Sequence, residues 1–260
     1  HGMQNRPASG PGPLILAIEK IAKLRDAQME PWRSTMFADH YLAECVLVGG
    51  ARRAARMATK TWRDKTIFDF INLKRGGFLW SSNNSVTVDE EFWKYVNDPA
   101  IKSDIAHHAR NVFEAIALAS YYDGTGEPGI INQDKLTQKE DGFENYLDGH
   151  FAESKKYKLD EETIDLTKLL ALTASNMQYH QITNPCGEIT LNLLGGYCVI
   201  ADVVPDHATS DEDAADAFRT ATRALMRVNL MDSMYNKEVK RTNRIGVGIT
   251  GFHEWAWSRF

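Results

Sequence analysis

The residues with the clearest capacity for chemistry lie together in one short segment, Asn184–Ile189, which reads Asn-Pro-Cys-Gly-Glu-Ile. In an extended chain alternate side chains point the same way, which places Asn184, Cys186 and Glu188 on one face. The carboxylate of Glu188 could move a proton, the amide of Asn184 could orient a hydroxyl group, and the thiol of Cys186 could act as a nucleophile or a hydrogen-atom carrier. A buried structural cysteine beside a solvated glutamate is the competing interpretation.

A second thiol, Cys198, follows Cys186 by twelve residues, across a turn that contains Gly195 and Gly196. An antiparallel return would bring the two thiols close together, and such a pair could supply two electrons by forming a disulfide. A zinc site is the competing explanation, but neither a Cys-x-x-Cys motif nor a spaced histidine pair accompanies these thiols. We therefore expect no metal site.

A basic stretch lies between Glu44 and Asp64, where the chain has no acidic residue. Gly49 and Gly50 place flexible backbone beside two guanidinium groups, a combination that suits a phosphate or a nucleotide. As a bare pattern, a solvated basic face is the commoner outcome. The cations of the stretch are Arg52, Arg53, Arg56, Lys60 and Arg63.

The elements that must position these groups alternate between helices and short apolar strands, which favours an α/β fold. From apolar spacing and capping signals, helices are expected at about 14–24, 37–48, 67–73, 101–122, 165–177 and 210–234, and from about 252. Strands are expected at 129–131, which should be buried, and at 189–191, 197–204 and 245–249. The weakly alternating segment 78–88 is a strand or its exit loop, 51–58 is a helix or an ordered loop, and 137–165 is a charged surface excursion.

Composition narrows the class of protein. The 260 residues carry 30 basic and 35 acidic side chains, a formal net charge of −5, which argues against a protein that coats nucleic acid. The longest apolar runs are far shorter than a membrane span. Three cysteines are too few for a disulfide scaffold and suit a reducing cytoplasm. We therefore expect a cytoplasmic protein without nucleic-acid or membrane partners.

The order of several motifs resembles the catalytic chain of ribonucleotide reductases. Asn184–Ile189 is similar to the active-site finger loop of that family, and Cys45–Ala55 resembles the loop that links the effector and substrate sites. Gly126–Asn132 resembles the strand before the finger loop, and Arg244–Phe252 resembles the strand and helix start after it. The resemblance extends over nearly the whole chain.

Three details resemble the adenosylcobalamin-dependent class of the family: the Asn-Pro-Cys-Gly-Glu pattern, the polar run Ser81–Ser85, and the short step to Cys198. The last of these is most similar to the monomeric triphosphate reductases. The resemblance implies a ten-stranded α/β barrel of two five-stranded halves with the finger loop at its centre. It also implies reduction of ribonucleotides to 2′-deoxyribonucleotides for DNA synthesis, with adenosylcobalamin as cofactor, deoxynucleoside triphosphates as effectors and a thioredoxin-type reductant.

The resemblance implies a role for each candidate residue. Cys186 would carry the thiyl radical that abstracts the 3′ hydrogen of the ribose, Glu188 would take the 3′-hydroxyl proton, and Asn184 would hold the sugar hydroxyls. Cys198 would be one of two reducing thiols, and Gly49, Gly50, Arg52 and Arg53 would form the substrate and effector loop. Residues 1–260 would be the central part of the barrel, truncated at both ends and inactive alone. Cys45 is given no role.

Three alternatives stay open from the sequence. The same reaction could belong to a diphosphate reductase that works with a diiron protein partner. A cysteine hydrolase would need a histidine to activate Cys186, and the nearest, His180, is six residues away. A non-catalytic nucleotide-binding module would explain the basic stretch but gives no reason for an Asn-Cys-Glu face.

Overall fold

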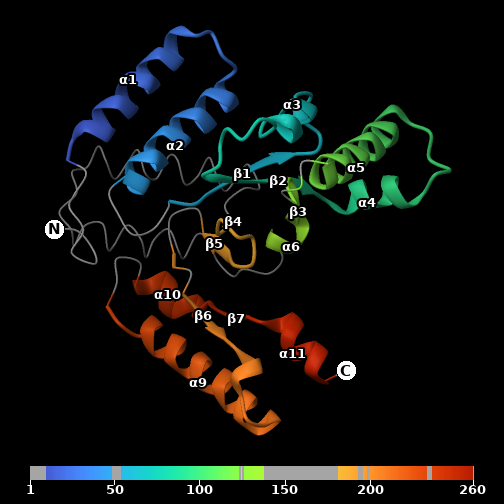
Figure 1. The fold of residues 1–260 in the computed structure, drawn as a ribbon. Coiled ribbons are helices and arrows are strands. Elements are labelled where there is room, and N and C mark those ends of the chain that lie inside the picture. The colour runs from blue at the N-terminus through green and yellow to red at the C-terminus, as the bar shows by residue number, and fades with distance from the viewer. Residues whose placement is uncertain are drawn as a thin grey trace. The chain divides into compact units, whose positions relative to one another are not determined.

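The computed structural model of the chain describes residues 10–48, 54–122, 124, 126–137, 181–192, 196–197, 199–232 and 236–259 (Figure 1). The charged excursion from residue 138 onward and the helix expected at 165–177 lie outside these residues. The chain divides into two compact units. The first comprises His1–Lys135 and Pro185–Gly187, and the second comprises Leu136–Asn184 and Glu188–Phe260.

The first unit is organised around a parallel three-stranded sheet in the order β1-β2-β3 (Figure 1). Its strands are β1 (Arg56–Thr61), β2 (Ser82–Val88) and β3 (Gly129–Asn132). Parallel strands need long crossover connections, and these contain α3 (Ile67–Asn72), α4 (Glu90–Asn97) and α5 (Asp104–Tyr122). In the register between β1 and β2, Met57 is paired with Asn83. The pairing of β2 with β3 begins only at Ser85, opposite Gly129, so β3 does not reach the residues of β2 before Ser85.

Apolar side chains of this sheet and its crossover helices form one core. On α5, Ala109, Val112 and Ile116 recur at three- and four-residue spacing and bury one face of the helix. The rings of Trp62 and Phe92 are fully buried and meet edge to face, with 5.3 Å between their centroids. The buried members of the core are Trp62, Ile67, Phe70, Ile71, Val86, Val88, Phe92, Ala109, Val112, Ile116 and Ala119.

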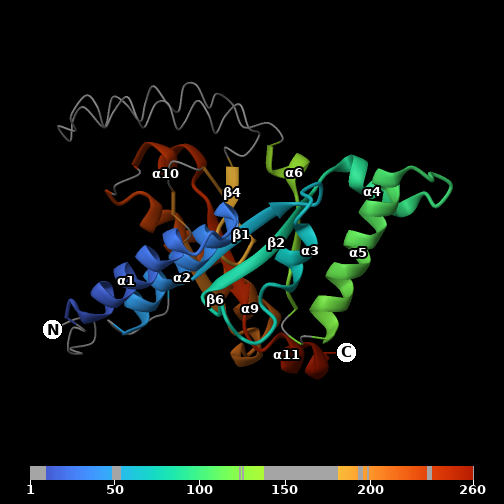
Figure 2. The ribbon, with the colours of Figure 1, turned by 90° about the horizontal axis from the view of Figure 1, so that it is seen from above.

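Two helices, α1 (Gly12–Asp26) and α2 (Pro31–Val48), precede the sheet and lie side by side (Figures 1 and 2). Pro13 stands in the first turn of α1, where a backbone N–H has no intrahelical partner to lose. Lys20 of α1 forms an ion pair of 2.9 Å with Glu44 of α2. The second helix starts earlier than the expected Phe37, because Pro31 is preorganised for a first helical turn.

The second unit contains a hairpin, a parallel strand pair and helices. β4 (Gln181–Thr183) pairs antiparallel with β5 (Thr190–Asn192), and β6 (Val199–Val203) pairs in parallel with β7 (Ile245–Ile249). Ser210 caps α9 (Asp211–Asn229) by accepting a hydrogen bond of 3.1 Å from the Asp213 N–H, as the capping pattern predicts. The other elements after β3 are α6 (Gln133–Thr137), the 3-10 helix η2 (Pro205–His207), α9 (Asp211–Asn229), α10 (Asn236–Thr242) and α11 (Phe252–Arg259).

The expected α/β class is confirmed, with parallel strands in two of the sheets, and one expected helix end needs correction. Within the described ranges the strands form three separate sheets, and closure into a barrel is not seen. The helix from Ser210 ends at Asn229 rather than near Met234, because the Asn229 amide donates to Asn243 Oδ1 and to the Arg244 carbonyl and so ends the helix against that segment. The segment at 51–58, left open as helix or loop, becomes strand β1 from Arg56 onward.

Strand β3 also differs from expectation, because Ile130 is 37% exposed. β3 is an edge strand of its sheet, so only one of its sides is covered by a neighbouring strand. No helix in the described part of the chain is long and apolar enough to cross a membrane.

Candidate active site

The segment Asn184–Ile189 forms the turn of the β4–β5 hairpin. The last residue pair of the two strands is Thr183 with Thr190. Beyond it the Asn184 N–H donates a hydrogen bond of 3.0 Å to the Ile189 carbonyl, which closes the turn. Ile189 is buried and its Cδ1 would lie 3.7 Å from a Cβ at Gly246 of β7, so the closing residue is packed within the second unit. The candidate residues therefore stand on one short turn with a fixed base.

The expectation that this segment is extended was wrong. Residues 185–189 are a turn and bends, so alternation of side chains does not set their directions. Pro185 fixes its own φ and has no N–H to donate to a strand ladder. Gly187 has φ of +84°, a left-handed conformation in which a side chain would be strained. These two residues reverse the chain, and Cys186 between them is exposed with a free thiol.

The reversal brings Asn184 and Glu188 together. Asn184 is only 3% exposed, and its Oδ1 accepts a hydrogen bond of 3.0 Å from the Ile189 N–H. That bond sets the orientation of the amide, so its Nδ2 points to Glu188 and donates to Oε1 at 2.6 Å. Glu188 is an exposed residue, and its carboxylate is thereby held by a charge-assisted hydrogen bond.

The turn can offer three different groups to a ligand: a thiol at its tip, an exposed carboxylate, and an amide that orients that carboxylate. Asn184 and Glu188 are thus in contact. Asn184, Cys186 and Glu188 share a turn and not the extended face that was expected. Within the described residues, no group of three or more His, Cys, Asp or Glu side chains could hold a metal ion.

The other candidate residues lie outside the described residues. These are Cys198 and the glycines and arginines of the basic loop, Gly49, Gly50, Arg52 and Arg53. The pairing of Cys198 with a second thiol and the binding of a nucleotide by the basic loop therefore stay predictions.

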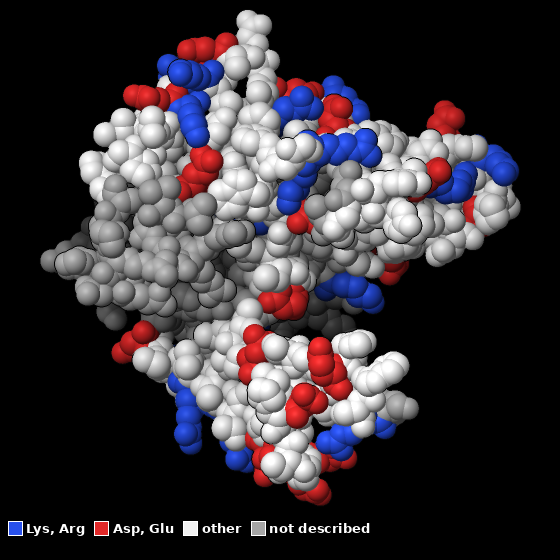
Figure 3. All heavy atoms as spheres, viewed as in Figure 1, with Lys and Arg blue, Asp and Glu red and all other residues white. Residues whose placement is uncertain are grey.

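Three cations at the end of the basic stretch are matched by acids of the first unit. Arg56 Nε lies 3.5 Å from Asp39 Oδ1, and Lys60 Nζ lies 3.1 Å from Asp64 Oδ2. On the face shown in Figure 3, basic and acidic side chains lie interspersed. For these positions the ordinary interpretation, a solvated face with internal ion pairs, describes the structure.

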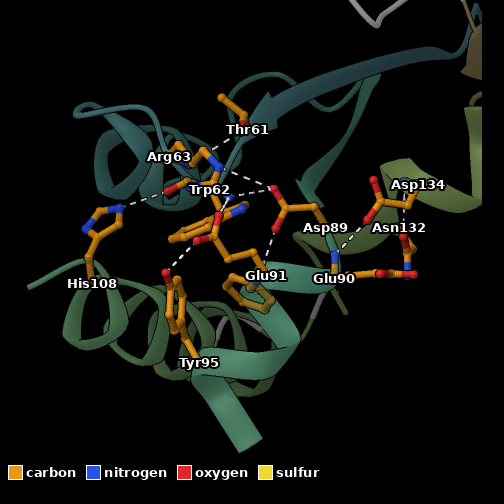
Figure 4. Close-up of polar contacts among 11 residues, drawn as sticks. Thr61, Trp62, Arg63, Asp89, Glu90, Glu91, Tyr95, His108, Asn132 and Asp134 are labelled. Carbon is orange, nitrogen blue, oxygen red and sulfur yellow. Dashed lines mark hydrogen bonds and ion pairs between the residues drawn. The ribbon is translucent and has the colours of Figure 1, made fainter. Parts of the chain in front are cut away.

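Arg63 completes this set in a network that fixes the start of α4 (Figure 4). Its Nη2 lies 2.9 Å from Asp89 Oδ2 and also pairs with Glu91, whose other oxygen accepts from the Tyr95 hydroxyl at 2.5 Å. Asp89 caps α4 by accepting from the Phe92 N–H at 2.8 Å. Burial alone would raise the pKa of Asp89, but the hydrogen bonds from the Phe92 N–H and from Arg63 outweigh it and lower the pKa.

One residue that contacts the turn was not found from the sequence. The side-chain amide of Asn83, on β2, donates a hydrogen bond to the carbonyl oxygen of Pro185. Asn83 stands in the polar run Ser81–Ser85, to which the sequence assigned a strand or loop but no role. The polar character of that run, in a strand whose other residues are buried, is the signal that could have singled it out.

Comparison with known proteins points in one direction. A family model described as the ribonucleotide reductase barrel domain matches residues 19–259. The adenosylcobalamin-dependent ribonucleoside-triphosphate reductase of Lactobacillus gasseri is 28% identical to the chain. The match covers 97% of the chain and 29% of the relative. A putative adenosylcobalamin-dependent ribonucleoside-triphosphate reductase of Mycobacterium phage D29 is 29% identical over 94% of the chain and 33% of the relative. The chain spans about a third of the length of these curated relatives.

Proposed function

The chain belongs to the ribonucleotide reductase family, and we propose that it is the central part of the catalytic barrel of an adenosylcobalamin-dependent ribonucleoside-triphosphate reductase. The observation that carries the proposal is the turn on which Cys186 is exposed while Asn184 holds the Glu188 carboxylate at 2.6 Å. The names of the relatives support the cofactor and the triphosphate substrate. In the whole protein, closure of the strands into a ten-stranded barrel would surround this turn.

The cofactor fits the chemistry of the turn, because a free and exposed thiol is the group that can exchange a hydrogen atom with a radical source. Adenosylcobalamin, when bound, supplies the radical, which no ordinary side chain can generate alone. The later steps of the reaction are carried out by side chains of the protein. The Cys186 sulfur, as a thiyl radical, takes the hydrogen atom from C3′ of the ribose and becomes a thiol.

Glu188 accepts the proton of the 3′-hydroxyl, while the 2′-hydroxyl takes a proton from one of the two reducing thiols and leaves as water. Asn184 keeps the carboxylate in place during this proton transfer and orients the sugar hydroxyls. Cys198 is one of two thiols that give two electrons to the sugar and become a disulfide, which a thioredoxin-type protein then reduces. The Cys186 thiol then returns its hydrogen atom to C3′ and becomes a thiyl radical again. Mounting Asn184, Cys186 and Glu188 on one turn limits their relative motion, and radical chemistry depends on such positioning.

In this proposal the loop with Gly49, Gly50, Arg52 and Arg53 faces the nucleotide, and deoxynucleoside triphosphates act as effectors through it. Guanidinium groups beside flexible backbone suit phosphate oxygens. The product would serve DNA synthesis.

The test uses the whole protein that carries this chain, with adenosylcobalamin, a dithiol reductant and each ribonucleoside triphosphate. Formation of deoxynucleotides is expected only with the cofactor present, and Cys186→Ala should abolish it. Cys45→Ser is the matched thiol control, because Cys45 lies in α2, where its thiol donates to the Pro13 carbonyl at 3.4 Å. Turnover by Cys186→Ala, or turnover of diphosphates without the cofactor, would contradict the proposal.

A further inference from the structure

Two neighbouring residues of the parallel sheet contact the tip of the active-site turn. Met57 of β1 and Asn83 of β2 are paired in the strand register. The Asn83 Nδ2 donates to the Pro185 carbonyl, the group that directly precedes Cys186. A Cβ added at Gly187 would lie 4.0 Å from Met57 Cε, so the Met57 side chain lies beside the residue that follows Cys186. Both chain neighbours of the thiol therefore lie beside the parallel sheet, within the unit to which Pro185–Gly187 belong.

The direction of Asn83 follows from the geometry of its strand. Side chains alternate between the faces of a strand, so Asn83 projects opposite to Ser82 and Asn84. Those two are buried and bond to each other, with Ser82 Oγ donating to Asn84 Oδ1 at 2.9 Å. The strand is thus anchored on one face by its own polar pair and presents Asn83 on the other.

An ion pair fixes the same part of β2 along its edge. Because β3 pairs with β2 only from Ser85 onward, no strand of the described residues lies beside the main chain of Ser82 and Asn84 on that side. Lys74 Nζ donates to the Ser82 carbonyl at 2.5 Å, and Glu127 Oε2 accepts from the Asn84 N–H at 3.1 Å. Lys74 and Glu127 are themselves 2.7 Å apart. The pair takes the place of strand hydrogen bonds on both sides of Asn83, which gives the amide a rigid base.

We propose that Asn83 is a positioning residue that holds the tip of the turn, and with it the Cys186 sulfur, through its hydrogen bond to the Pro185 carbonyl. The functional part of this inference rests on the proposed reductase reaction, in which a hydrogen atom must pass between Cys186 and the ribose. Asn83 acts through the main chain and not on the substrate. Its loss should therefore slow the chemical step without weakening the binding of nucleotide.

The experiment compares Asn83→Asp with Asn111→Asp in the whole protein. Aspartate keeps the shape of asparagine but cannot donate to a carbonyl oxygen, and Asn111 is an exposed residue of α5 that controls for the added charge. Asn83→Ala serves as a second, uncharged variant in case the half-buried charge prevents folding. The readouts are kcat and KM for the ribonucleotide, and hydrogen–deuterium exchange of the peptide over residues 181–192.

The proposal expects kcat of the Asn83 variants to fall by about tenfold or more, the effect of one such hydrogen bond, with KM unchanged and faster exchange of the turn. Asn111→Asp should match the parent in kcat, in KM and in the exchange rate of the turn. Exchange that is unchanged in both Asn83 variants overturns the positioning role, as does an unchanged kcat in an active protein. If the parent itself reduces no nucleotide, the proposed function fails, while the exchange measurement still decides whether Asn83 holds the turn.

Discussion

Asn184 donates its side-chain amide to Glu188 Oε1 at 2.6 Å, across a turn whose tip carries Cys186. The same amide accepts a hydrogen bond from the Ile189 N–H at 3.0 Å, so it cannot rotate without losing both bonds. A buried residue thereby determines the direction of an exposed carboxylate. Asn184 thus has a structural task and a proposed catalytic task, and substitutions can separate them.

The first substitution is Asn184→Asp. An aspartate oxygen can still accept from the Ile189 N–H, so the turn should close, but the donor to Glu188 is replaced by a second negative charge. The expected result is a fall in kcat of about ten- to a hundredfold, because a hydrogen bond to a charged group contributes roughly 1.5–3 kcal/mol. Steady-state kinetics on the whole protein checks this, with Asn111→Asp as the charge control. A kcat within twofold of the parent would remove Asn184 from the proposed mechanism.

The second substitution, Glu188→Gln, removes the proposed proton acceptor. A glutamine oxygen can still accept from the Asn184 amide, so the turn should keep its conformation. Loss of a general base typically costs about 10²–10⁴ in rate, and we expect kcat to fall within that range while nucleotide binding is retained. Glu114→Gln on α5 is the matched control at an exposed carboxylate. The mechanism assigned to Glu188 would be wrong if the variant turned over at the parental rate.

The parts of the fold that sequence reasoning found are those in which a local pattern is sufficient. The helix expected at 101–122 is α5, because its apolar residues recur at helical spacing, and the strand at 245–249 is β7. α4 was missed, since it is only eight residues long and its capping residue, Asp89, is part of the Arg63 network. Strand β4 was missed because its three residues carry no pattern of their own.

The candidate site shows the same division. The identities of Asn184, Cys186 and Glu188 follow from a motif, but their geometry depends on pairing between β4 and β5, which turns an expected extended segment into a hairpin turn. The contact of Asn83 with Pro185 joins residues 102 positions apart, and no spacing rule connects positions so distant. It is visible only when the strand and the turn are both in place.

The Lys74–Glu127 pair should contribute to stability, because both side chains are mostly buried, at 19% and 23% exposed. Lys74→Met removes the ammonium group that lies 2.7 Å from Glu127 and that donates to the Ser82 carbonyl. We expect the free energy of unfolding to fall by about 1–3 kcal/mol, measured by urea denaturation. The double variant with Glu127→Gln should lose less than the sum of the two single variants.

The control for this prediction is the ion pair of Arg219 and Asp216 on α9, whose side chains are 61% and 72% exposed. Surface pairs of this kind contribute little, so Arg219→Ala should leave the urea midpoint nearly unchanged. Equal effects of Lys74→Met and Arg219→Ala would show that burial does not strengthen the Lys74–Glu127 pair, and additive single and double variants would show that the two residues are not coupled.

The last prediction concerns acid stability and the carboxylate that caps α4. Hydrogen bonds from the Phe92 N–H and Arg63 outweigh the opposing effect of burial and hold the pKa of Asp89 below its ordinary value of 3.8. A carboxylate with a lowered pKa in the folded state contributes stability that is present above its unfolded pKa and is lost as pH falls through its folded pKa. Asp89→Asn keeps the helix cap but removes the titrating group. The free energy of unfolding should therefore fall less steeply between about pH 5 and pH 3 in Asp89→Asn than in the parent, and Glu114→Gln should follow the parent. Identical slopes in all three proteins would mean that Asp89 and its bond to Arg63 contribute nothing to acid sensitivity.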